Sequence, residues 1–341
     1  MTGASALAGA RVLVTGGAGF IGSHLVTALL GDAGVDRVLV LDSLATGTRA
    51  NLAHLGEDSR LELRVGDVAS PKDAADAVAG VDVVFHLACL GVRHSLHDPV
   101  ENHRVNAEGS LVLLQAALRR GVSRLVHVSS SEVYGTAQYA PMDEEHPTHP
   151  ETVYGAGKLA GEAYARAHFR TYALPVVVAR PFNTYGPRSH FEGDSGEVIP
   201  RTIVRALCGL PALVFGDGEQ SRDFTHVSDT AAGLIALAGA PDVLGRTVNL
   251  GSGAEITVNE LAELVRELVG NDGPAAEHLE PRPGDVRRLL VDDARMRALC
   301  EWKPRVDLRT GIAELVDWFA TREQSPQEML RRIEDRNWVA P

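Results

Sequence analysis

The first half of the chain alternates short apolar runs with longer segments of helical character. Six of the apolar runs, rich in Val and Leu, predict strands, over residues 11–16, 37–42, 61–68, 82–88, 124–130 and 175–182. Continuous apolar runs are typical of strands buried on both faces, and helix-length segments between them are typical of crossover connections. The sequence therefore predicts an α/β fold: a doubly wound parallel sheet with helices on both faces.

The alternation loosens after about residue 184, where we expect a second domain to begin. Helices are predicted over residues 19–34, 99–121, 151–173, 200–209, 257–270 and 307–320, and the Gly-, Pro- and charge-rich stretch 184–200 predicts a loop. A strand within 246–253 is expected to rejoin the first sheet. We therefore expect a first domain over residues 8–184, to which segments near 225–253 return, and a smaller, discontinuous, mixed α/β domain over 185–335.

The net charge of the chain limits the kinds of molecule that it is expected to bind. The formal net charge is −12, from 45 acidic and 33 basic residues, whereas proteins that bind nucleic-acid backbones are normally basic. Aromatic residues make up only 5%, few for a protein that stacks on bases. No apolar run approaches the ~20 residues of a membrane span. We expect neither a nucleic acid nor a membrane as a partner.

Cysteine and histidine usage indicates a reducing compartment and no metal site. Cys89, Cys208 and Cys300 are far apart and form no disulfide framework. Residues 1–11 lack the charged start and apolar run of a signal peptide, so we expect a cytoplasmic protein. The histidines at 94, 97 and 103 match no zinc-ligand spacing.

The stretch RVLVTGGAGFIGSHL, residues 11–25, places Gly16, Gly19 and Gly22 between the first strand and the first helix. In a dinucleotide-binding turn such glycines allow a tight bend, close approach of a phosphate and close packing of helix against strand. The N–H groups at the start of the helix then face the pyrophosphate. A plain glycine turn is the alternative interpretation.

Two carboxylates strengthen the dinucleotide interpretation. Asp42 ends the second predicted strand, about 20 residues after Gly22, where an acid accepts hydrogen bonds from the adenosine ribose and repels the extra phosphate of NADP. Asp67 follows the third strand, near the expected adenine amino group; a helix N-cap is the alternative for this residue. Together these residues predict NAD rather than NADP as cofactor.

Tyr154 and Lys158, in YGAGK, lie one helical turn apart on one face of the predicted helix 151–173. A neighbouring ammonium, with the positive charge of a nicotinamide, is expected to lower the pKa of the phenol. The tyrosine would then take a proton from a sugar hydroxyl as hydride leaves for NAD.

At this point the chain resembles a known family, the extended short-chain dehydrogenases that act on nucleotide sugars, such as UDP-glucose 4-epimerase. The resemblance runs nearly end to end, through the ordered motifs VTGGAGFIGSHL, FHLA, SSSEVYG, YGAGK, RPFNTYGPR, GDGEQSRDFTHVSD, NLGSG and RPGDVRR. It implies a Rossmann-like domain that holds NAD and a smaller C-terminal domain that binds a nucleoside diphosphate sugar. It also implies a homodimer through helices near 98–120 and 152–170.

The resemblance assigns roles to individual residues. Ser130 matches the hydroxyl residue that hydrogen-bonds the sugar O4, Tyr154 the base, and Lys158 its partner, which also holds the nicotinamide ribose. The cofactor site would further include Gly16, Gly19, Phe20, Ile21, Gly22, Asp42, Asp67, Val68, Leu87, Ala88 and Asn106. Substrate binding would fall on Arg93, Ser130 and Ser131 at the sugar, Asn183, Arg222 and Arg282 at the diphosphate, and Phe215 and Asp285 at the nucleoside. Core packing for Phe215 and a surface loop acid for Asp285 are the alternatives.

The run SSSEVYG bears on the reaction that follows oxidation at C4. dTDP-glucose dehydratases resemble T-D-E here, whereas this chain has Ser130, Ser131 and Glu132, so the acid at 131 is absent. Simple 4-epimerases usually carry a small or hydroxyl residue in place of Glu132, while UDP-glucuronate decarboxylases and GDP-mannose dehydratases show a similar T-S-E. We favour 4-epimerisation of a UDP-hexose. The alternative is a dehydration or decarboxylation that uses Glu132. Glu132 could also be a loop acid that only orients its neighbours. A more distant interpretation is a non-catalytic protein that senses NAD.

Three further features concern the sugar. Glucuronate 4-epimerases resemble T-V-Y-G-P-x-x-R, whose arginine meets the carboxylate, but this chain has Asn183 and His190 at those positions. This difference disfavours glucuronate 4-epimerase activity. Arg93 lies where the family contacts the sugar, so a sugar with a carboxylate or an extra hydroxyl group is still an alternative. Cys89 is expected to be a packing residue, and the loop 188–200 is expected to shape sugar choice.

Overall fold

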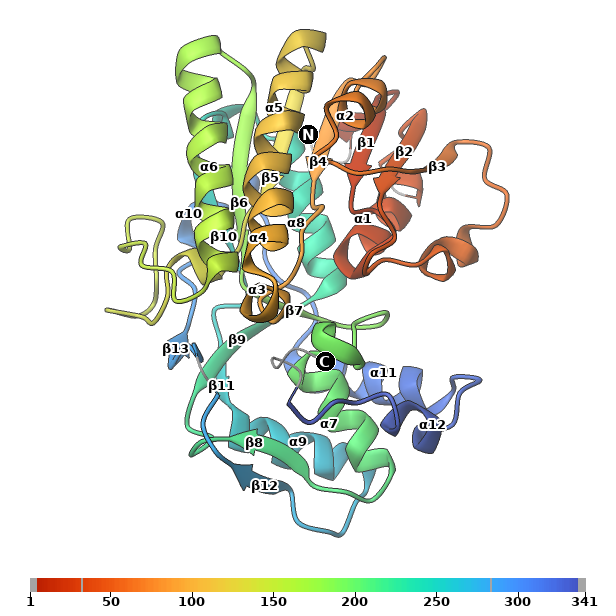
Figure 1. The fold of residues 1–341 in the computed structure, drawn as a ribbon, viewed down its shortest axis with the longest axis vertical. Helices are drawn as coiled ribbons and strands as arrows, with labels where there is room; N and C mark the ends of the chain where they lie inside the picture. The colour runs from red at the N-terminus through yellow and green to blue at the C-terminus, as the bar shows by residue number, and fades with distance from the viewer. Residues whose placement is uncertain (1–4, 32, 283, 337–341) are drawn as a thin grey trace.

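The upper part of the molecule is a seven-stranded parallel sheet (Figure 1). The computed structural model describes residues 5–31, 33–282 and 284–336. The strands are β1 Arg11–Thr15, β2 Arg37–Asp42, β3 Leu61–Val65, β4 Val83–His86, β5 Arg124–Val128, β6 Val176–Pro181 and β10 Thr247–Leu250, in the order β10-β6-β5-β4-β1-β2-β3. The predicted doubly wound sheet is confirmed, and β10 pairs in parallel with β6. Residues 1–4, on which the expected lack of a signal peptide partly rests, lie outside the described residues.

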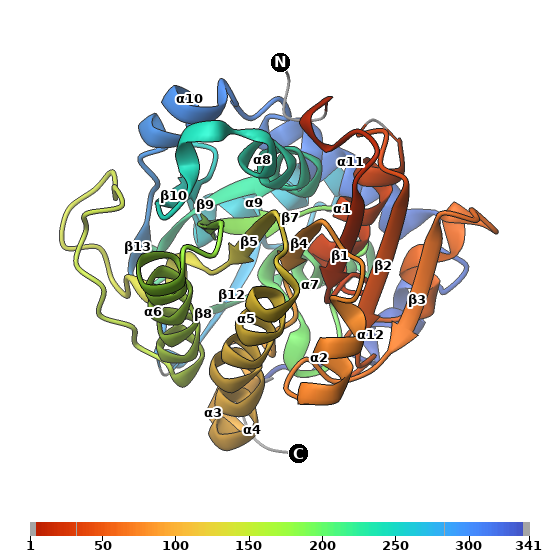
Figure 2. The ribbon, with the colours of Figure 1, turned by 90° about the horizontal axis from the view of Figure 1, so that it is seen from above.

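Helices cover both faces of this sheet (Figure 2). On one face α1 (Phe20–Gly31) and α8 (Val227–Gly239) bury Leu and Ile side chains against the strands. On the other face the cover is α2 (Pro71–Ala77), α5 (Gly109–Arg120) and α6 (Val153–Tyr172). The apolar strand residues are buried on both sides, as the continuous apolar runs indicated.

The lower part has its own core and smaller sheets. Strands β7 Asn183–Tyr185, β9 Ser221–His226, β11 Glu255–Thr257 and β13 Arg288–Leu289 form one sheet, and β8 Ala212–Phe215 pairs with β12 Ala276–Leu279. The helices are α7 Val198–Leu207, α9 Val258–Val269, α11 Leu308–Ala320 and α12 Pro326–Leu330, while α10 Ala294–Cys300 packs against α8 and β10. The proposed division into domains stays a prediction.

Several of the predicted ends of helices and strands are wrong, and most of these errors lie where the chain leaves a helix or a strand. The runs 61–68 and 124–130 stop as strands at Val65 and Val128, because the residues that follow turn from the sheet toward a cavity. The predicted helix 99–121 consists of α4 (Pro99–His103), a π-helical turn (Arg104–Glu108) and α5. The predicted loop 184–200 begins inside β7 and ends inside the first turn of α7.

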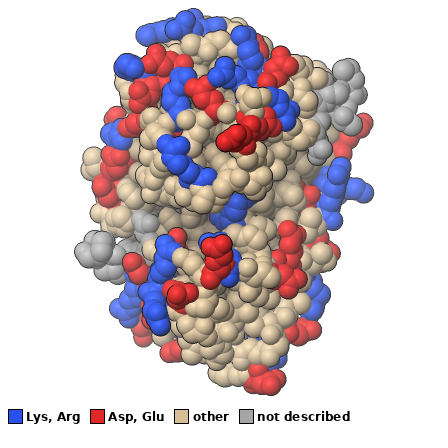
Figure 3. All heavy atoms as spheres, turned by 90° about the vertical axis from the view of Figure 1, so that its right-hand side faces the viewer, with Lys and Arg blue, Asp and Glu red and all other residues tan. Residues whose placement is uncertain are grey.

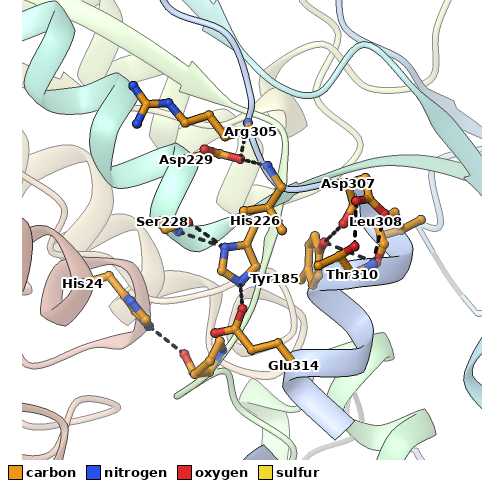
Figure 4. A network of polar contacts seen from close by, with 12 residues as sticks. His24, Tyr185, His226, Ser228, Asp229, Arg305, Asp307, Leu308, Thr310 and Glu314 are labelled. Carbon is orange, nitrogen blue, oxygen red and sulfur yellow. Dashed lines mark hydrogen bonds and ion pairs between the residues drawn. The ribbon is translucent and has the colours of Figure 1, made fainter. Parts of the chain in front are cut away.

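A polar network joins the upper and lower parts (Figure 4). Asp229, in the first turn of α8, accepts hydrogen bonds from the backbone N–H groups of Arg305 and Val306, both at 2.9 Å. On α1, His24 bonds the carbonyl of Pro187 at 2.8 Å. These contacts fix the segment before α11 and the chain after β7 beneath the carboxyl ends of the parallel strands. On the face drawn in Figure 3, acidic and basic side chains are interspersed.

A buried ion pair ties α6 to the sheet. Glu162 on α6, fully buried, accepts two hydrogen bonds from Arg180 on β6, at 2.7 and 2.8 Å. Burial acts to raise the pKa of Glu162, but the Arg180 guanidinium outweighs it and holds the pKa below its usual value. The stabilisation is therefore present at neutral pH and is lost as the pH falls through that lowered pKa.

Replacing Glu162 by Gln leaves the Arg180 charge buried without its counter-charge. We expect the free energy of unfolding, measured by urea titration, to fall by about 3–5 kcal/mol. The matched change Asp76→Asn, in the exposed pair with Lys72, should cost less than about 1 kcal/mol. Equal effects of the two substitutions would contradict a structural role for the buried pair.

Candidate active site

A large cavity lies at the carboxyl ends of the parallel strands. Its volume is about 750 Å³, and it is lined from both the upper and the lower part. The sheet order reverses between β1 and β4, and ligands of open α/β sheets bind in the crevice outside such a switch point. Of the predicted site residues, all but Asn106 line this cavity.

The glycine turn after β1 allows contacts that a side chain would block. Gly16 has φ +71°, and a Cβ there would lie 2.8 Å from the backbone nitrogen of Ala88. At Gly22 a Cβ would lie 2.1 Å from the carbonyl oxygen of Gly16. The first turn of α1 thus packs directly on the loop, with its N-terminus facing the cavity. This cradle fits the pyrophosphate of a dinucleotide.

The two predicted adenosine carboxylates also line the cavity, and both already hold backbone groups. Asp42 is buried and accepts from Ala18 N–H at 2.9 Å and Leu44 N–H at 2.8 Å, which ties the glycine turn to the end of β2. Asp67 accepts from Arg104 at 2.7 Å. The N-cap alternative for Asp67 is wrong, because Ser70 caps α2. Each carboxylate oxygen has a second lone pair, so both acids keep capacity for ligand hydroxyl or amino groups.

Asn106 lies outside the cavity lining. Its amide oxygen accepts from Leu90 N–H at 2.9 Å, and its amide nitrogen donates to the Leu90 carbonyl at 2.9 Å. It therefore holds the 88–91 segment, whose members contact the cavity, and its effect on a cofactor is indirect.

Tyr154 and Lys158 lie in the first two turns of α6, which Thr152 caps through Gly155 N–H. Lys158 is 3% exposed, and its Nζ donates to the Val128 carbonyl at the end of β5, at 2.6 Å. Ser130 follows two residues later, and its hydroxyl accepts from Glu132 N–H at 3.2 Å. The end of β5 and the start of α6 therefore bring a hydroxyl, a phenol and an ammonium group to one wall of the cavity.

The prediction that neighbouring groups of the protein lower the pKa of Tyr154 is wrong. Burial raises the pKa of this phenol, Cys89 and Glu132 add to the rise, and hydrogen bonding to Ser130 only partly offsets it. Burial lowers the pKa of Lys158. The Lys158 ammonium bonds to the Val128 carbonyl, so the main positive charge that would favour phenolate has to come from a bound ligand.

Glu132 is a part-buried acid whose pKa is influenced by three arginines. Burial raises its pKa, while Arg222, Arg282 and Arg93 lower it, and the net direction is upward. Its side chain lines the cavity close to Tyr154, whose pKa it influences. Such a carboxyl is equipped either to hydrogen-bond a sugar or to move a proton.

An arginine pair marks the lower wall of the cavity. Arg222 and Arg282 both donate to the same oxygen of Asp285, at 2.7 and 2.9 Å. The surface-acid alternative for Asp285 is therefore wrong, since its side chain is 16% exposed and paired. Two guanidinium groups against one carboxylate leave net positive charge, which suits a phosphate-bearing ligand.

The lining residues missed from sequence include Glu197 and Arg201. These two residues stand at the start of α7, after a stretch without hydrophobic periodicity. Their spacing of one helical turn was the available signal. In the part of the chain that the structure describes, no group of three or more His, Cys, Asp or Glu side chains is placed to hold a metal ion. No helix there is long and apolar enough to cross a membrane.

Known proteins resemble this chain in both sequence and fold. The model of the NAD-dependent epimerase/dehydratase family matches residues 12–251. A putative UDP-glucose 4-epimerase of Methanocaldococcus jannaschii is 36% identical, over 92% of this chain and all of that protein. A dTDP-glucose 4,6-dehydratase of Actinoplanes is 38% identical, over 91% of this chain and 97% of the relative. The solved structure of an epimerase from Methanothermobacter thermautotrophicus superposes with a TM-score of 0.88 at 33% identity, covering 96% of both chains.

Gly22→Ala tests the glycine cradle. The added methyl group would overlap the Gly16 carbonyl, so we expect NAD affinity, measured by calorimetry, to fall at least about tenfold. Gly31→Ala at the end of α1 meets no atom within 4 Å and serves as the matched control, with NAD affinity unchanged. Unaltered NAD affinity in Gly22→Ala would contradict the assignment of this turn.

Proposed function

The chain belongs to the NAD-dependent epimerase/dehydratase family, and we propose that it is a UDP-hexose 4-epimerase that works by transient oxidation of the sugar at C4. The observation that carries this proposal is the set Ser130, Ser131, Tyr154 and Lys158 on one wall of the cavity. A hydroxyl residue, Ser131, stands where dehydratases of the resembling type carry an acid. A putative UDP-glucose 4-epimerase is among the relatives, and so are dTDP-glucose 4,6-dehydratases of similar identity, so Ser131 and not the relatives carries this choice.

The cofactor would lie along the glycine cradle, with its ribose hydroxyls at Asp42 and its nicotinamide ribose near Lys158. NAD, when bound, supplies the hydride acceptor and a positive charge beside the phenol. That charge would oppose the burial that now raises the Tyr154 pKa. The cradle, the buried Asp42 and the lining by Val68 and Leu87 all fit this group.

The chain's own residues would perform the proton transfer and the positioning. Tyr154 would take the proton of the C4 hydroxyl while Ser130 hydrogen-bonds the same oxygen. Lys158, fixed on the Val128 carbonyl, would orient the cofactor ribose. Turning the 4-keto sugar in the cavity would present its other face; with return of the hydride to C4 from that side, Tyr154 would give the proton back to the oxygen, so the reaction is redox-neutral overall.

The substrate's nucleotide would lie in the lower part. Arg222 and Arg282 would bind the diphosphate by charge-assisted hydrogen bonds, together with Asn183. Phe215, at the end of β8, would lie under the base, and Asp285, already held by both arginines, would also meet the nucleotide ribose.

A homodimer through α4, α5 and α6 is part of the proposal. Helices α5 and α6 lie side by side on the outside of the sheet (Figure 2). Large apolar side chains are exposed along this surface, including Val100 at 78% and Tyr172 at 55%. Their burial against a second copy would remove apolar area from water.

A dehydratase or decarboxylase remains the second candidate, because Glu132 lines the cavity and has a raised pKa. Product analysis separates the two. UDP-glucose and UDP-glucuronate would be offered to the protein and the products examined by mass spectrometry and proton NMR. We expect inverted C4 stereochemistry with unchanged mass, and turnover that largely persists in Glu132→Gln. Loss of water or carbon dioxide, abolished in Glu132→Gln, would overturn the epimerase assignment.

Removal of the Tyr154 hydroxyl tests the proposed proton transfer. Tyr154→Phe should lower kcat by about 10²–10⁴-fold, the usual contribution of general acid–base catalysis, with the affinity for UDP unchanged. Tyr164→Phe on the same helix, outside the cavity lining, is the matched control and should keep normal turnover. Near-normal kcat in Tyr154→Phe would refute the mechanism.

A further inference from the structure

The lower side of the cavity is lined partly by the 188–200 loop and by the start of α7. Part of this loop has no regular secondary structure, so its shape depends on contacts with other parts of the chain. The lining residues here include His190, Ser195 and Glu197 on the loop and Arg201 and Arg205 on α7.

One anchor of the loop lies in the core of the lower part. The buried Phe191 ring meets the Phe319 ring of α11 edge-on, with the ring centroids 5.8 Å apart. A Cβ at Gly196 would lie 2.8 Å from the Phe191 carbonyl oxygen, so the chain returns close to this anchor before α7 begins.

A second anchor is the segment that follows α12, residues 331–336. The Arg332 guanidinium forms an ion pair with Glu192 and lies over the Phe191 ring, 5.8 Å from its centroid. The Gly193 N–H donates to the Arg332 carbonyl at 3.4 Å. Arg332 therefore contacts three consecutive residues of the loop.

The same segment also holds Arg201. The Nη2 group of Arg201 donates to the carbonyls of Glu334 at 2.8 Å and Asp335 at 3.2 Å. One turn further along α7, Nη1 of Arg205 lies 3.8 Å from a carboxylate oxygen of Asp335. Backbone carbonyls are neutral acceptors, so they orient the Arg201 guanidinium without cancelling its charge.

The segment 331–336 is itself attached to the lower core. Met329, in the last turn of α12, is fully buried there, and Ile333 packs against the same group of apolar side chains. The N–H groups of Arg332 and Ile333 donate to the carbonyls of Met329 and Leu330 at 3.0 and 3.1 Å. Helix α12 lies beside α7 (Figure 1). The segment therefore links the core to both lining elements.

We propose that Arg332, Glu334 and Asp335 are positioning residues of the substrate site. Arg332 sets the 188–200 loop, and the carbonyls of Glu334 and Asp335 set Arg201. These three residues are not among the lining residues that the structure describes, so they act through residues that do line the cavity.

This inference rests on the proposed function, which supplies the substrate class, a nucleoside diphosphate sugar. The sugar would meet the loop, and the negative charge of the diphosphate would be attracted by Arg201. Without the segment, the loop and Arg201 would take up several arrangements. Binding would then have to order them, which lowers substrate affinity.

Substitution of Arg332 tests the contact with the loop. Arg332→Ala loses the ion pair with Glu192 and the contact with the Phe191 ring. We expect the affinity of the NAD-loaded protein for UDP-glucose, measured by calorimetry, to fall about three- to tenfold. NAD affinity and kcat should change less than about twofold, because the glycine cradle and the wall that carries Tyr154 are untouched.

Two variants serve as controls for Arg332→Ala. Arg332→Lys keeps a cation near Glu192 and the Phe191 ring, so it should keep most of the UDP-glucose affinity. Arg331→Ala removes the neighbouring, exposed arginine and should keep the wild-type affinity.

Hydrogen exchange in the wild type tests the coupling without any substitution. Coupling between two sites is reciprocal, so a segment that favours substrate binding is itself stabilised by bound substrate. UDP-glucose added to the NAD-loaded protein should therefore slow amide exchange in residues 329–336 as well as in the 188–200 loop.

The outcomes separate this inference from the proposed function. An unchanged UDP-glucose affinity in Arg332→Ala, or an equal loss in Arg331→Ala, would overturn the positioning role. So would unchanged amide exchange in residues 329–336 when UDP-glucose is bound. Failure of the wild type to bind UDP-glucose would instead overturn the proposed function, and this inference with it.

Discussion

The hydrogen bond from the Lys158 ammonium to the Val128 carbonyl is the contact on which the site depends. It joins the second turn of α6 to the end of β5 at 2.6 Å, in a place that excludes water. The buried Glu162–Arg180 pair repeats the attachment one turn further along, to β6. With α6 fixed in this way, Tyr154 comes to the same wall as Ser130. The wall that carries Tyr154 and Ser130 is therefore attached directly to the central sheet.

The opposite wall is built from the lower part, and its chemistry differs. There, arginines outnumber acids around Asp285, which suits a diphosphate in a protein whose net charge is −12. The cavity is lined from both parts, for example by Arg93 from the upper part and Glu197 from the lower. The polar network around Asp229 and His24 keeps the parts in register (Figure 4). In the proposed function, proton transfer therefore belongs to the upper wall of the cavity and diphosphate binding to the lower wall.

Local sequence patterns predicted the sheet and a set of site residues nearly all of which line the cavity, because each pattern depends on residues close together in the chain. The glycine turn is determined by contacts between Gly16 and Gly22, and the Tyr154–Lys158 face by helical spacing. Contacts between segments that lie far apart in the chain could not be predicted from these local patterns. Glu197 reaches the cavity only because α7 folds beneath the sheet, and the Tyr154 pKa rises because burial outweighs the hydrogen bond to Ser130. Asn106 was misplaced because its amide satisfies the Leu90 backbone instead of facing the cavity.

The central claim is that one hydrogen leaves C4 of a UDP-hexose and returns to the same carbon. UDP-glucose labelled with deuterium at C4 would be incubated with the NAD-loaded protein in ordinary water, and the product examined by NMR and mass spectrometry. We expect the 4-epimer, of unchanged mass, with deuterium retained at C4. Deuterium lost from C4 or found at another carbon, or a product lighter by one water, would contradict epimerisation and make Glu132 the residue that directs the reaction.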